Sequence, residues 1–358
     1  MNKMTSKLEE YIKGSLVNLS LQNQHLSGAG ATYEFEQKLK KYYSKKFVIT
    51  FSNCTTALLS LCVSLNLKNK DIITSPLNWG GSISPFLLFD NKIIFSAVEN
   101  ISFNLDPLKL STSLTPGTRA VLSVDYNGTP ADSKSIRDFC HKNDLVYISD
   151  SAQSFGAFRD NKPAGFFADF IVLSFGPGKS LFGGEGGAIL TDNESTYEKI
   201  IWLTQHPLRH KKTFGPESYN EYSPINGRLN PLSAIMLNVL FYDYIKKIKT
   251  HQINSFEFMY LLNKNELIQL PKQLFKFNNS AYFKQQCSLL KNVKIKEVNN
   301  FLNKHNFNYQ ADRFVPNIIP LDKIFKKQFR NKFFSNNSLF KDIKCTEFVE
   351  LKKRTMGI

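Results

Sequence analysis

The sequence is poor in glycine, tryptophan and cysteine, and it has no long apolar run. Its 358 residues include 18 glycines, 2 tryptophans and 5 cysteines. The cysteines lack the CxxC spacing of zinc sites and redox pairs, so we expect reduced thiols and no bound metal. No apolar stretch approaches the roughly 20 residues that span a bilayer, and the polar first residues do not predict a signal peptide. We therefore expect a cytoplasmic protein without an integral membrane segment.

Acidic residues are outnumbered by basic ones, and the imbalance is local. The chain has 46 Lys and Arg against 30 Asp and Glu, a net charge of +16. Residues 241–358 contribute +13 of this, with 22 basic and 9 acidic residues. Single lysines spread among Asn and Phe are typical of a solvated face; the alternative is attraction to an anionic ligand or membrane surface. No known nucleic-acid-binding signature accompanies them, so we do not expect nucleic acid as a partner.

Short apolar strands alternate with helices in the first two thirds of the chain. Runs such as "AVLSVDY" and "DFIVLSF" are separated by stretches of helical spacing such as "TTALLSLCVSLNL". This alternation predicts an α/β fold, with a mostly parallel sheet covered by helices on both faces. Thr32, ahead of Phe35 and Leu39, predicts the cap of an amphipathic helix.

The pattern changes near residue 240, where Asn, Lys and Phe become frequent and the periodicity weakens. We expect three parts: a helical arm over 1–26, a large three-layer α/β/α domain over 27–240, and a smaller α+β domain over 241–358.

The glycines that the chain does have are concentrated around one lysine. The stretch "SFGPGKSLFGGEGGAIL", residues 174–190, contains six of the 18 and includes Lys179. Glycine lets a backbone approach a ligand closely. A P-loop is excluded, because GxxxxGK[ST] would require glycine where Leu173 stands.

Other unusual residues fall at predicted strand ends, where ligands of parallel sheets bind. Small hydroxyl residues follow Asn53 at a predicted helix start, which suits a phosphate. Trp79 precedes two glycines, Asp150 ends the strand "LVYIS" with Gln153 three residues later, and Ser174 lies five residues before Lys179. Each feature alone also fits an ordinary role, such as a helix cap, a core aromatic residue or an exposed lysine.

Taken in order, these stretches resemble the DegT-type sugar aminotransferases, pyridoxal 5'-phosphate (PLP) enzymes with the aspartate-aminotransferase fold. The resemblance covers residues 27–240 and rests on "SGAGATYEFEQKL", "NCTTAL", "SPLNW", "TPGTRAVLSVDYNGTPAD", "DSAQSFGA", "SFGPGKSLFGGEGGAILT" and "NGRLNPLSA". The sequence departs from the family where Cys54 replaces a glycine, Gly178 a threonine, Gly227 a tyrosine and Pro231 a glutamate. Residues beyond 241 match poorly, and we expect the last helix of the small domain to be missing.

The resemblance implies specific roles in cofactor binding. Lys179 forms a Schiff base with PLP, and Asp150 keeps the pyridine nitrogen protonated so that the ring accepts electrons. Trp79 stacks on the ring and Gln153 contacts its phenolic oxygen. The phosphate contacts are Thr55, Thr56 and Ser174, joined by Asn226 from the neighbouring subunit, which implies a homodimer with shared sites.

The activity implied is transfer of an amino group, through pyridoxamine phosphate (PMP), from a donor such as L-glutamate to a keto group on a nucleotide-linked sugar. This chemistry serves the biosynthesis of surface polysaccharides or natural-product sugars. In the basic stretch 205–212 we expect Arg209, Lys211 or Lys212 to help hold the substrate's diphosphate, with an exposed charged loop as the alternative. Arg228 matches the family arginine and is a further candidate substrate contact or a structural residue.

Three other functions are considered on the basis of the same family resemblance. An aminotransferase acting on a cyclitol or another non-nucleotide ketone fits the same residues, as does a non-catalytic PLP-fold binding protein. Related dehydratases carry histidine in place of the lysine, so Lys179 argues against that class.

Overall fold

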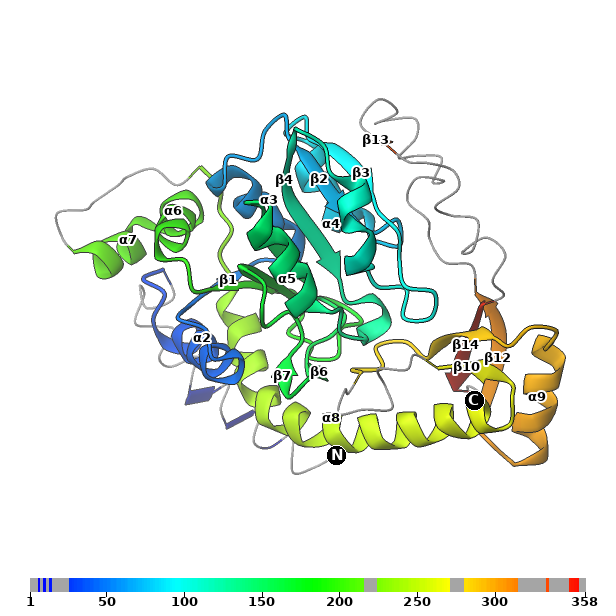
Figure 1. The fold of residues 1–358 in the computed structure, drawn as a ribbon. Coiled ribbons are helices and arrows are strands. Elements are labelled where there is room, and N and C mark those ends of the chain that lie inside the picture. Colours follow the sequence, from blue (N-terminus) through cyan, green and yellow to red (C-terminus); the bar gives the residue numbers. More distant parts are fainter. Residues whose placement is uncertain are drawn as a thin grey trace.

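The computed structural model describes residues 26–215, 224–270 and 280–314, with short pieces at 6, 9–10, 13–14, 333–334 and 348–353. Two lobes are connected by the long helix α8 (Pro231–Lys264), which passes from the larger lobe to the smaller one (Figure 1). Most of the predicted arm over 1–26 lies outside the described residues. Within the described part, no helix has both the length and the apolar composition needed to cross a membrane.

The large lobe is built on one sheet in the order β1-β9-β8-β5-β4-β2-β3-β13. Only β9 is antiparallel to its neighbours, whereas all other pairs are parallel, so the mostly parallel sheet predicted from the sequence is confirmed. The strands are β1 (Phe47–Phe51), β2 (Asp71–Thr74), β3 (Lys92–Phe95), β4 (Thr118–Val124), β5 (Val146–Asp150), β8 (Phe170–Ser174), β9 (Gly187–Thr191) and β13 (Phe333–Phe334).

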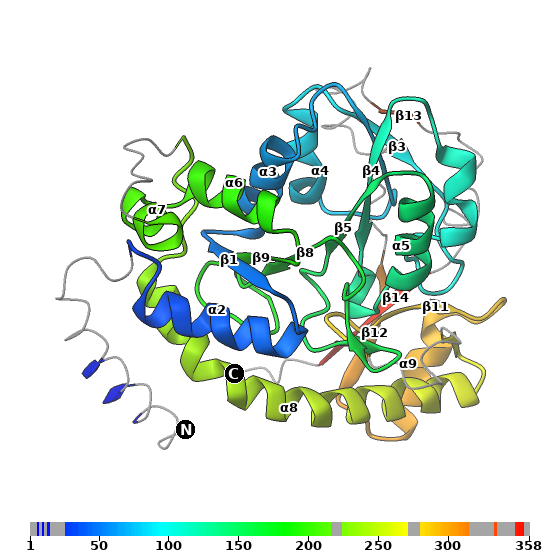
Figure 2. The same cartoon turned by 60° about the vertical axis from the view of Figure 1, so that its left-hand side comes forward.

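Helices cover both faces of this sheet (Figure 2). Alternate strand residues face opposite ways, so Tyr147 packs into one core and its neighbour Ile148 into the other. The first core is completed by α2 (Gly30–Tyr43), α5 (Ser133–Lys142) and the first half of α8. The second is completed by α3 (Cys54–Ser64), α4 (Gly80–Leu87) and α6 (Glu194–Thr204). The predicted three-layer arrangement is therefore present.

Shorter elements connect these layers. They are the 3-10 helices η1 (Pro107–Ser113) and η2 (Tyr126–Gly128), the hairpin of β6 (Phe158–Arg159) and β7 (Lys162–Pro163), and α7 (Pro207–Phe214). The predicted cap of α2 is wrong: the helix begins at Gly30, and Thr32 is buried inside its first turn. The N-cap residue is Ala29, which has no polar side chain, so no side chain caps the helix.

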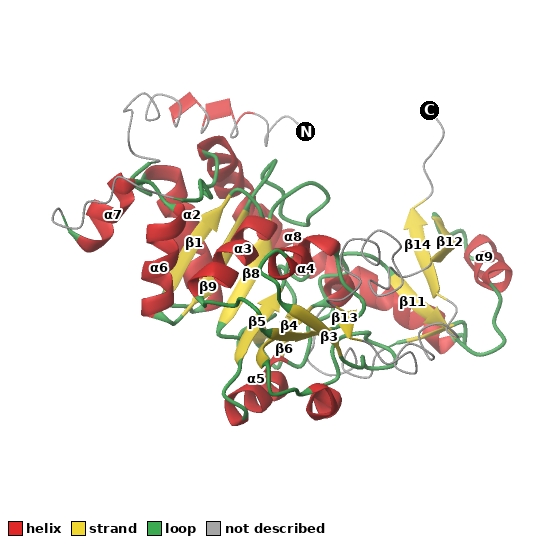
Figure 3. Cartoon of the chain, turned by 90° about the horizontal axis from the view of Figure 1, so that it is seen from above, coloured by secondary structure: helices red, strands yellow, loops and turns green. Residues whose placement is uncertain are grey.

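The small lobe is an antiparallel sheet with one helix against it (Figure 3). Its strands are β10 (Ile268–Gln269), β11 (Gln286–Leu289), β14 (Phe348–Lys353) and β12 (Tyr309–Phe314), and its helix is α9 (Ile295–Lys304). Residue 240 lies inside α8, which contributes Phe241 to the large core and Leu262 to the small one. The two lobes therefore share a helix instead of meeting at a linker.

Candidate active site

A cavity of about 470 Å³ lies at the carboxyl ends of β5 and β8. This volume is within the range of small-molecule sites, about 300–1,000 Å³. All four strand-end stretches singled out in the sequence converge on it. The lining residues from these stretches are Asn53, Cys54, Thr55, Asn78, Trp79, Gly81, Ser82, Asp150, Ala152, Gln153, Ser174, Pro177 and Lys179.

The start of α3 forms one wall of the cavity. The side chain of Asn53 caps the helix by accepting a hydrogen bond from the backbone N–H of Thr56, at 2.8 Å. Thr55 lines the cavity, whereas the hydroxyl of Thr56 accepts a hydrogen bond from Ser52 and does not. The first N–H groups of a helix have no partner within it, so this wall suits an anion.

Gly187 sets how closely the sheet approaches this wall. A Cβ atom there would lie 2.6 Å from the backbone nitrogen of Cys54, too close for any L side chain. Two other glycines of the Lys179 stretch also permit close packing: a Cβ on Gly183 would meet Leu237 at 2.6 Å, and one on Gly186 would meet Leu229 at 3.1 Å. Several of the six glycines therefore let the chain around Lys179 pack against the start of α3, against α8 and against the segment leading into α8.

Asp150 is buried at the end of β5, with its side chain in the cavity. Its Oδ2 accepts a hydrogen bond from the hydroxyl of Ser82 at 2.5 Å, and its Oδ1 accepts one from the backbone N–H of Ala152 at 3.1 Å. Burial raises the pKa of this carboxyl group, while these donors, Lys179 and Cys54 act in the opposite direction. The carboxyl group is thus desolvated but supplied with donors that favour its charged form.

Lys179 lies on the loop that follows β8 and faces the same cavity. Its Nζ atom is 4.8 Å from the centre of the Phe283 ring, which belongs to the segment leading into the small lobe. Gly178, directly before it, has a φ of +77°, a conformation that glycine adopts without strain. The amine therefore lies between the two lobes.

The predicted ring contacts also line the cavity. Trp79 precedes α4 and is 71% exposed, so its indole face is free for a flat partner. Gln153 accepts a hydrogen bond from the backbone N–H of Asn127 through its Oε1 atom, at 2.9 Å, which fixes the orientation of the amide. Ser174, the last residue of β8, also lines the cavity.

Arg209, expected to hold a diphosphate, is buried and does not line the cavity that contains Lys179. Its side chain is 5% exposed and forms two hydrogen bonds to the carboxylate of Glu36, at 3.1 and 2.9 Å. Neither Arg209 nor Lys211 lines the cavity, because α7 lies beside α2 and α6. Burial and the ion pair make Arg209 a structural residue, while Lys211 is exposed.

Asn226 and Arg228 lie outside the cavity that contains Lys179. They line a separate hollow together with Ser52 and Glu185. Asn226 is exposed there, and burial lowers the pKa of Arg228. Within one chain these two residues therefore do not join the other predicted site residues.

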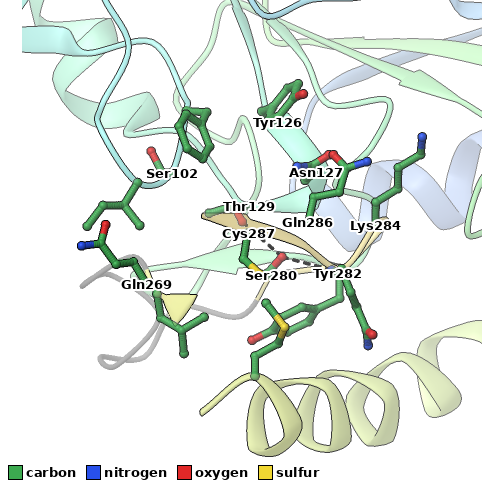
Figure 4. A pocket seen from close by; sticks show the side chains of 15 residues that line it. Ser102, Tyr126, Asn127, Thr129, Gln269, Ser280, Tyr282, Lys284, Gln286 and Cys287 are labelled. Carbon is green, nitrogen blue, oxygen red and sulfur yellow. Dashed lines mark hydrogen bonds between the residues drawn. The ribbon is translucent and has the colours of Figure 1, made fainter. Parts of the chain in front are cut away.

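The sequence did not indicate that residues of the small lobe and of α4 contribute to the cavity. Phe283, Lys284 and Gln286 complete the cavity, and a second, smaller hollow adjoins it between the lobes. Figure 4 shows Asn127, Lys284 and Gln286 at one edge of this hollow. Both amide atoms of Gln286 are buried without a hydrogen-bond partner among the described residues. No motif marks these positions, because the lobes are brought together only by tertiary packing.

Comparison with known proteins agrees with this geometry. The UDP-4-amino-4,6-dideoxy-N-acetyl-beta-L-altrosamine transaminase of Helicobacter pylori is 30% identical over 200 residues, 55% of this chain and 53% of that protein. The 3-oxo-glucose-6-phosphate:glutamate aminotransferase of Bacillus subtilis is 28% identical over 258 residues, 70% of this chain and 53% of that protein. The chain thus spans about half the length of these relatives.

The architecture is also that of known aminotransferases. The crystal structure of NtdA from Bacillus subtilis, with bound cofactor PMP, matches with a TM-score of 0.76 at 19% identity, covering 98% of this chain and 77% of that one. The fold and the convergent site define a chain of the aminotransferase type. The model of the DegT/DnrJ/EryC1/StrS aminotransferase family matches residues 9–342, and the chain belongs to this family.

Proposed function

We propose that this protein is a PLP-dependent aminotransferase that converts a nucleotide-linked keto-sugar to an amino sugar, in surface polysaccharide or natural-product sugar biosynthesis. The observation that carries the proposal is the convergence of Lys179, Asp150 and the start of α3 on one cavity. The family assignment supports the reaction class, and the H. pylori relative supports a nucleotide sugar as the acceptor.

The residues present fit PLP at three separate points. A phosphate suits the start of α3, where Gly187 leaves no side chain between sheet and helix. Trp79 would offer its exposed indole face to a pyridine ring, and Asp150 would offer a buried carboxyl group to the ring nitrogen, since both line the cavity. The aldehyde requires a nearby amine, which Lys179 provides.

When bound, PLP supplies an aldehyde carbon that amines attack and a protonated ring that withdraws electrons from that carbon. Asp150 holds the proton at the pyridine nitrogen, because a desolvated carboxylate retains a cationic partner strongly. Lys179 first anchors the cofactor. When not bonded to the cofactor, the amine of Lys179 would move a proton between the donor's α-carbon and the cofactor's C4′ carbon.

The amino donor that we propose is L-glutamate, because the B. subtilis relative is named as a glutamate aminotransferase. The acceptor then binds in the part of the cavity formed by the small lobe. There Lys284 supplies a positive charge and Gln286 supplies an amide that has no protein partner in the described part. Sugar hydroxyl groups and phosphate oxygens are suitable partners for these groups.

We further propose a cytoplasmic homodimer in which Asn226 reaches the cofactor phosphate of the partner subunit. The exposed position of Asn226, outside the cavity of its own chain, supports this arrangement. The described cysteines are all unpaired, as is usual in a reducing compartment.

A substrate panel tests the proposed reaction. The purified protein is incubated with PLP, L-glutamate and a set of keto-sugars carried on UDP, dTDP or GDP, and the products are identified by mass. Sugar phosphates and cyclitol ketones are run in parallel. We expect amination of a nucleotide-linked keto-sugar; amination only in the parallel set, or no amination with any acceptor, contradicts the proposal.

A further inference from the structure

The carboxylate of Asp150 is held by a residue that lies 68 positions away in the sequence. Ser82 is 5% exposed and donates its hydroxyl proton to Oδ2 of Asp150 at 2.5 Å. The other oxygen, Oδ1, accepts from the backbone N–H of Ala152, and the thiol of Cys54 lies 3.9 Å from it. A hydroxyl is a much better donor than a thiol, so Ser82 makes the strongest side-chain contact to this carboxylate.

Ser82 lies in the first turn of α4, which packs against α3. The first turn of α4 contains Gly81, where a Cβ atom would lie 2.9 Å from the Oγ1 of Thr55. This close approach fixes the start of α4 against the start of α3. The serine hydroxyl is consequently held beside the carboxylate before any cofactor arrives.

We propose that Ser82 is a positioning residue that orients the Asp150 carboxylate and keeps it ionised for the pyridine nitrogen of PLP. This inference rests on the proposed function. An ionised carboxylate is required because a neutral carboxyl group cannot stabilise a cationic ring.

Burial acts against that requirement, since it raises the pKa of Asp150. The hydrogen bond from Ser82 lowers the pKa again, because it stabilises the charged form. Removing the hydroxyl therefore raises the pKa of Asp150 further, and neutral carboxyl becomes populated at a higher pH. Two effects follow: weaker cofactor binding, and cofactor loss at a higher pH as the solution is acidified.

The test compares Ser82→Ala with wild type in the full-length protein. Cofactor-free protein is titrated with PLP from pH 5 to 9, and binding is followed by the visible absorbance of the cofactor. We expect Ser82→Ala to weaken PLP binding about tenfold at neutral pH, the usual effect of losing a hydrogen bond to a charged group. We also expect Ser82→Ala to lose PLP at a higher pH than wild type does as the solution is acidified.

Two further variants separate positioning from general damage. Ser82→Thr keeps the hydroxyl and is expected to bind PLP within about twofold of wild type. Ser84→Ala removes a hydroxyl from the same helix without touching the cavity, and it is expected to match wild type. If Ser82→Ala folds poorly, Ser82→Thr is compared with Ser82→Val, because the two new side chains have the same shape and only threonine has a hydroxyl.

The outcomes distinguish this inference from the proposed function. If Ser82→Ala, or Val in its place, binds PLP as wild type does at every pH, the positioning role is overturned while the aminotransferase assignment stands. If wild type binds no PLP, or if borohydride fixes none to Lys179, the proposed function fails and the inference fails with it.

Discussion

Arg209 and Glu36 form a two-point ion pair inside the large lobe, with nitrogen–oxygen distances of 3.1 and 2.9 Å. Glu36 also accepts hydrogen bonds from the backbone N–H and the hydroxyl of Thr50. The pair connects α7, α2 and β1, and both side chains are almost fully buried. Removal of either partner leaves an uncompensated charge in the interior.

We therefore expect Arg209→Ala to lower the free energy of unfolding by about 3–5 kcal/mol, the usual cost of breaking a buried ion pair. Urea unfolding followed by circular dichroism measures this. Lys211→Ala, on the same helix but exposed, is the control and is expected to change stability by no more than about 0.5 kcal/mol. An Arg209→Ala protein of wild-type stability with a raised Michaelis constant for the sugar nucleotide would restore the substrate role.

A second prediction concerns Asp125, which is fully buried at the end of β4. Burial raises its pKa, although hydrogen bonds from Ala131, Ser154 and Ser151 act in the opposite direction. The folded state binds the carboxyl proton of Asp125 more tightly than the unfolded state does. The contribution of this proton to the free energy of unfolding is therefore complete at pH values below the ordinary pKa of aspartate. It is lost as the pH rises through the raised, folded pKa.

The comparison with Asp125→Asn isolates this effect, because the variant cannot titrate at that position. We expect the stability of wild type relative to the variant to fall as the pH rises through that window. Urea unfolding at a series of pH values measures the difference. If the free energies of unfolding of the two proteins changed with pH in parallel, Asp125 would have an ordinary pKa in the folded state.

A third prediction follows from the contact between Gly187 and the start of α3. In Gly187→Ala the new Cβ meets the backbone of Asn53 and Cys54, at 2.5 and 2.6 Å, so the first turn must move. We expect a stability loss of about 1–3 kcal/mol, typical of overpacking. PLP binding should weaken by more than tenfold, on the order of a lost charge-assisted hydrogen bond or more.

Pyridoxal, which lacks the phosphate, is the control ligand for this variant. Its affinity is expected to stay near the wild-type value, because only the phosphate site is displaced. Equal weakening for PLP and pyridoxal would contradict a phosphate site at the start of α3.

A fourth prediction tests the shared site. Lys179→Ala and Asn226→Ala each inactivate homodimers, but a mixed dimer contains one site with both native residues. After joint refolding of the two inactive variants, we expect activity to return to about a quarter of the wild-type value, since half of the random dimers are mixed and each has one intact site. Failure to recover activity, with mixed dimers demonstrated by mass, would assign Asn226 no role across subunits.

The sequence was most informative about the large lobe. Continuous apolar strands such as Phe170–Ser174 are buried on both faces in any parallel sheet, so the pattern alone indicated the layers. Because such strands end at one edge, Asp150 and Lys179 could be predicted to lie near each other.

Contacts that depend on tertiary packing could not be predicted in this way. Ser82 reaches Asp150 across 68 positions of sequence, where α4 packs against α3, and nothing in the local sequence marks that contact. The burial of Arg209 could not be predicted, because a basic residue in a polar stretch is usually exposed and its partner Glu36 is 173 residues away. Phe283 and Gln286 enter the site from the small lobe, where periodicity is weak.

The central claim is that Lys179 bonds covalently to PLP. The protein is incubated with PLP, reduced with borohydride, digested and mapped by mass spectrometry. We expect one modified peptide that carries the cofactor on Lys179, and none in Lys179→Ala. A cofactor fixed to a different lysine at equal yield in both proteins, or to none in wild type, would contradict the account.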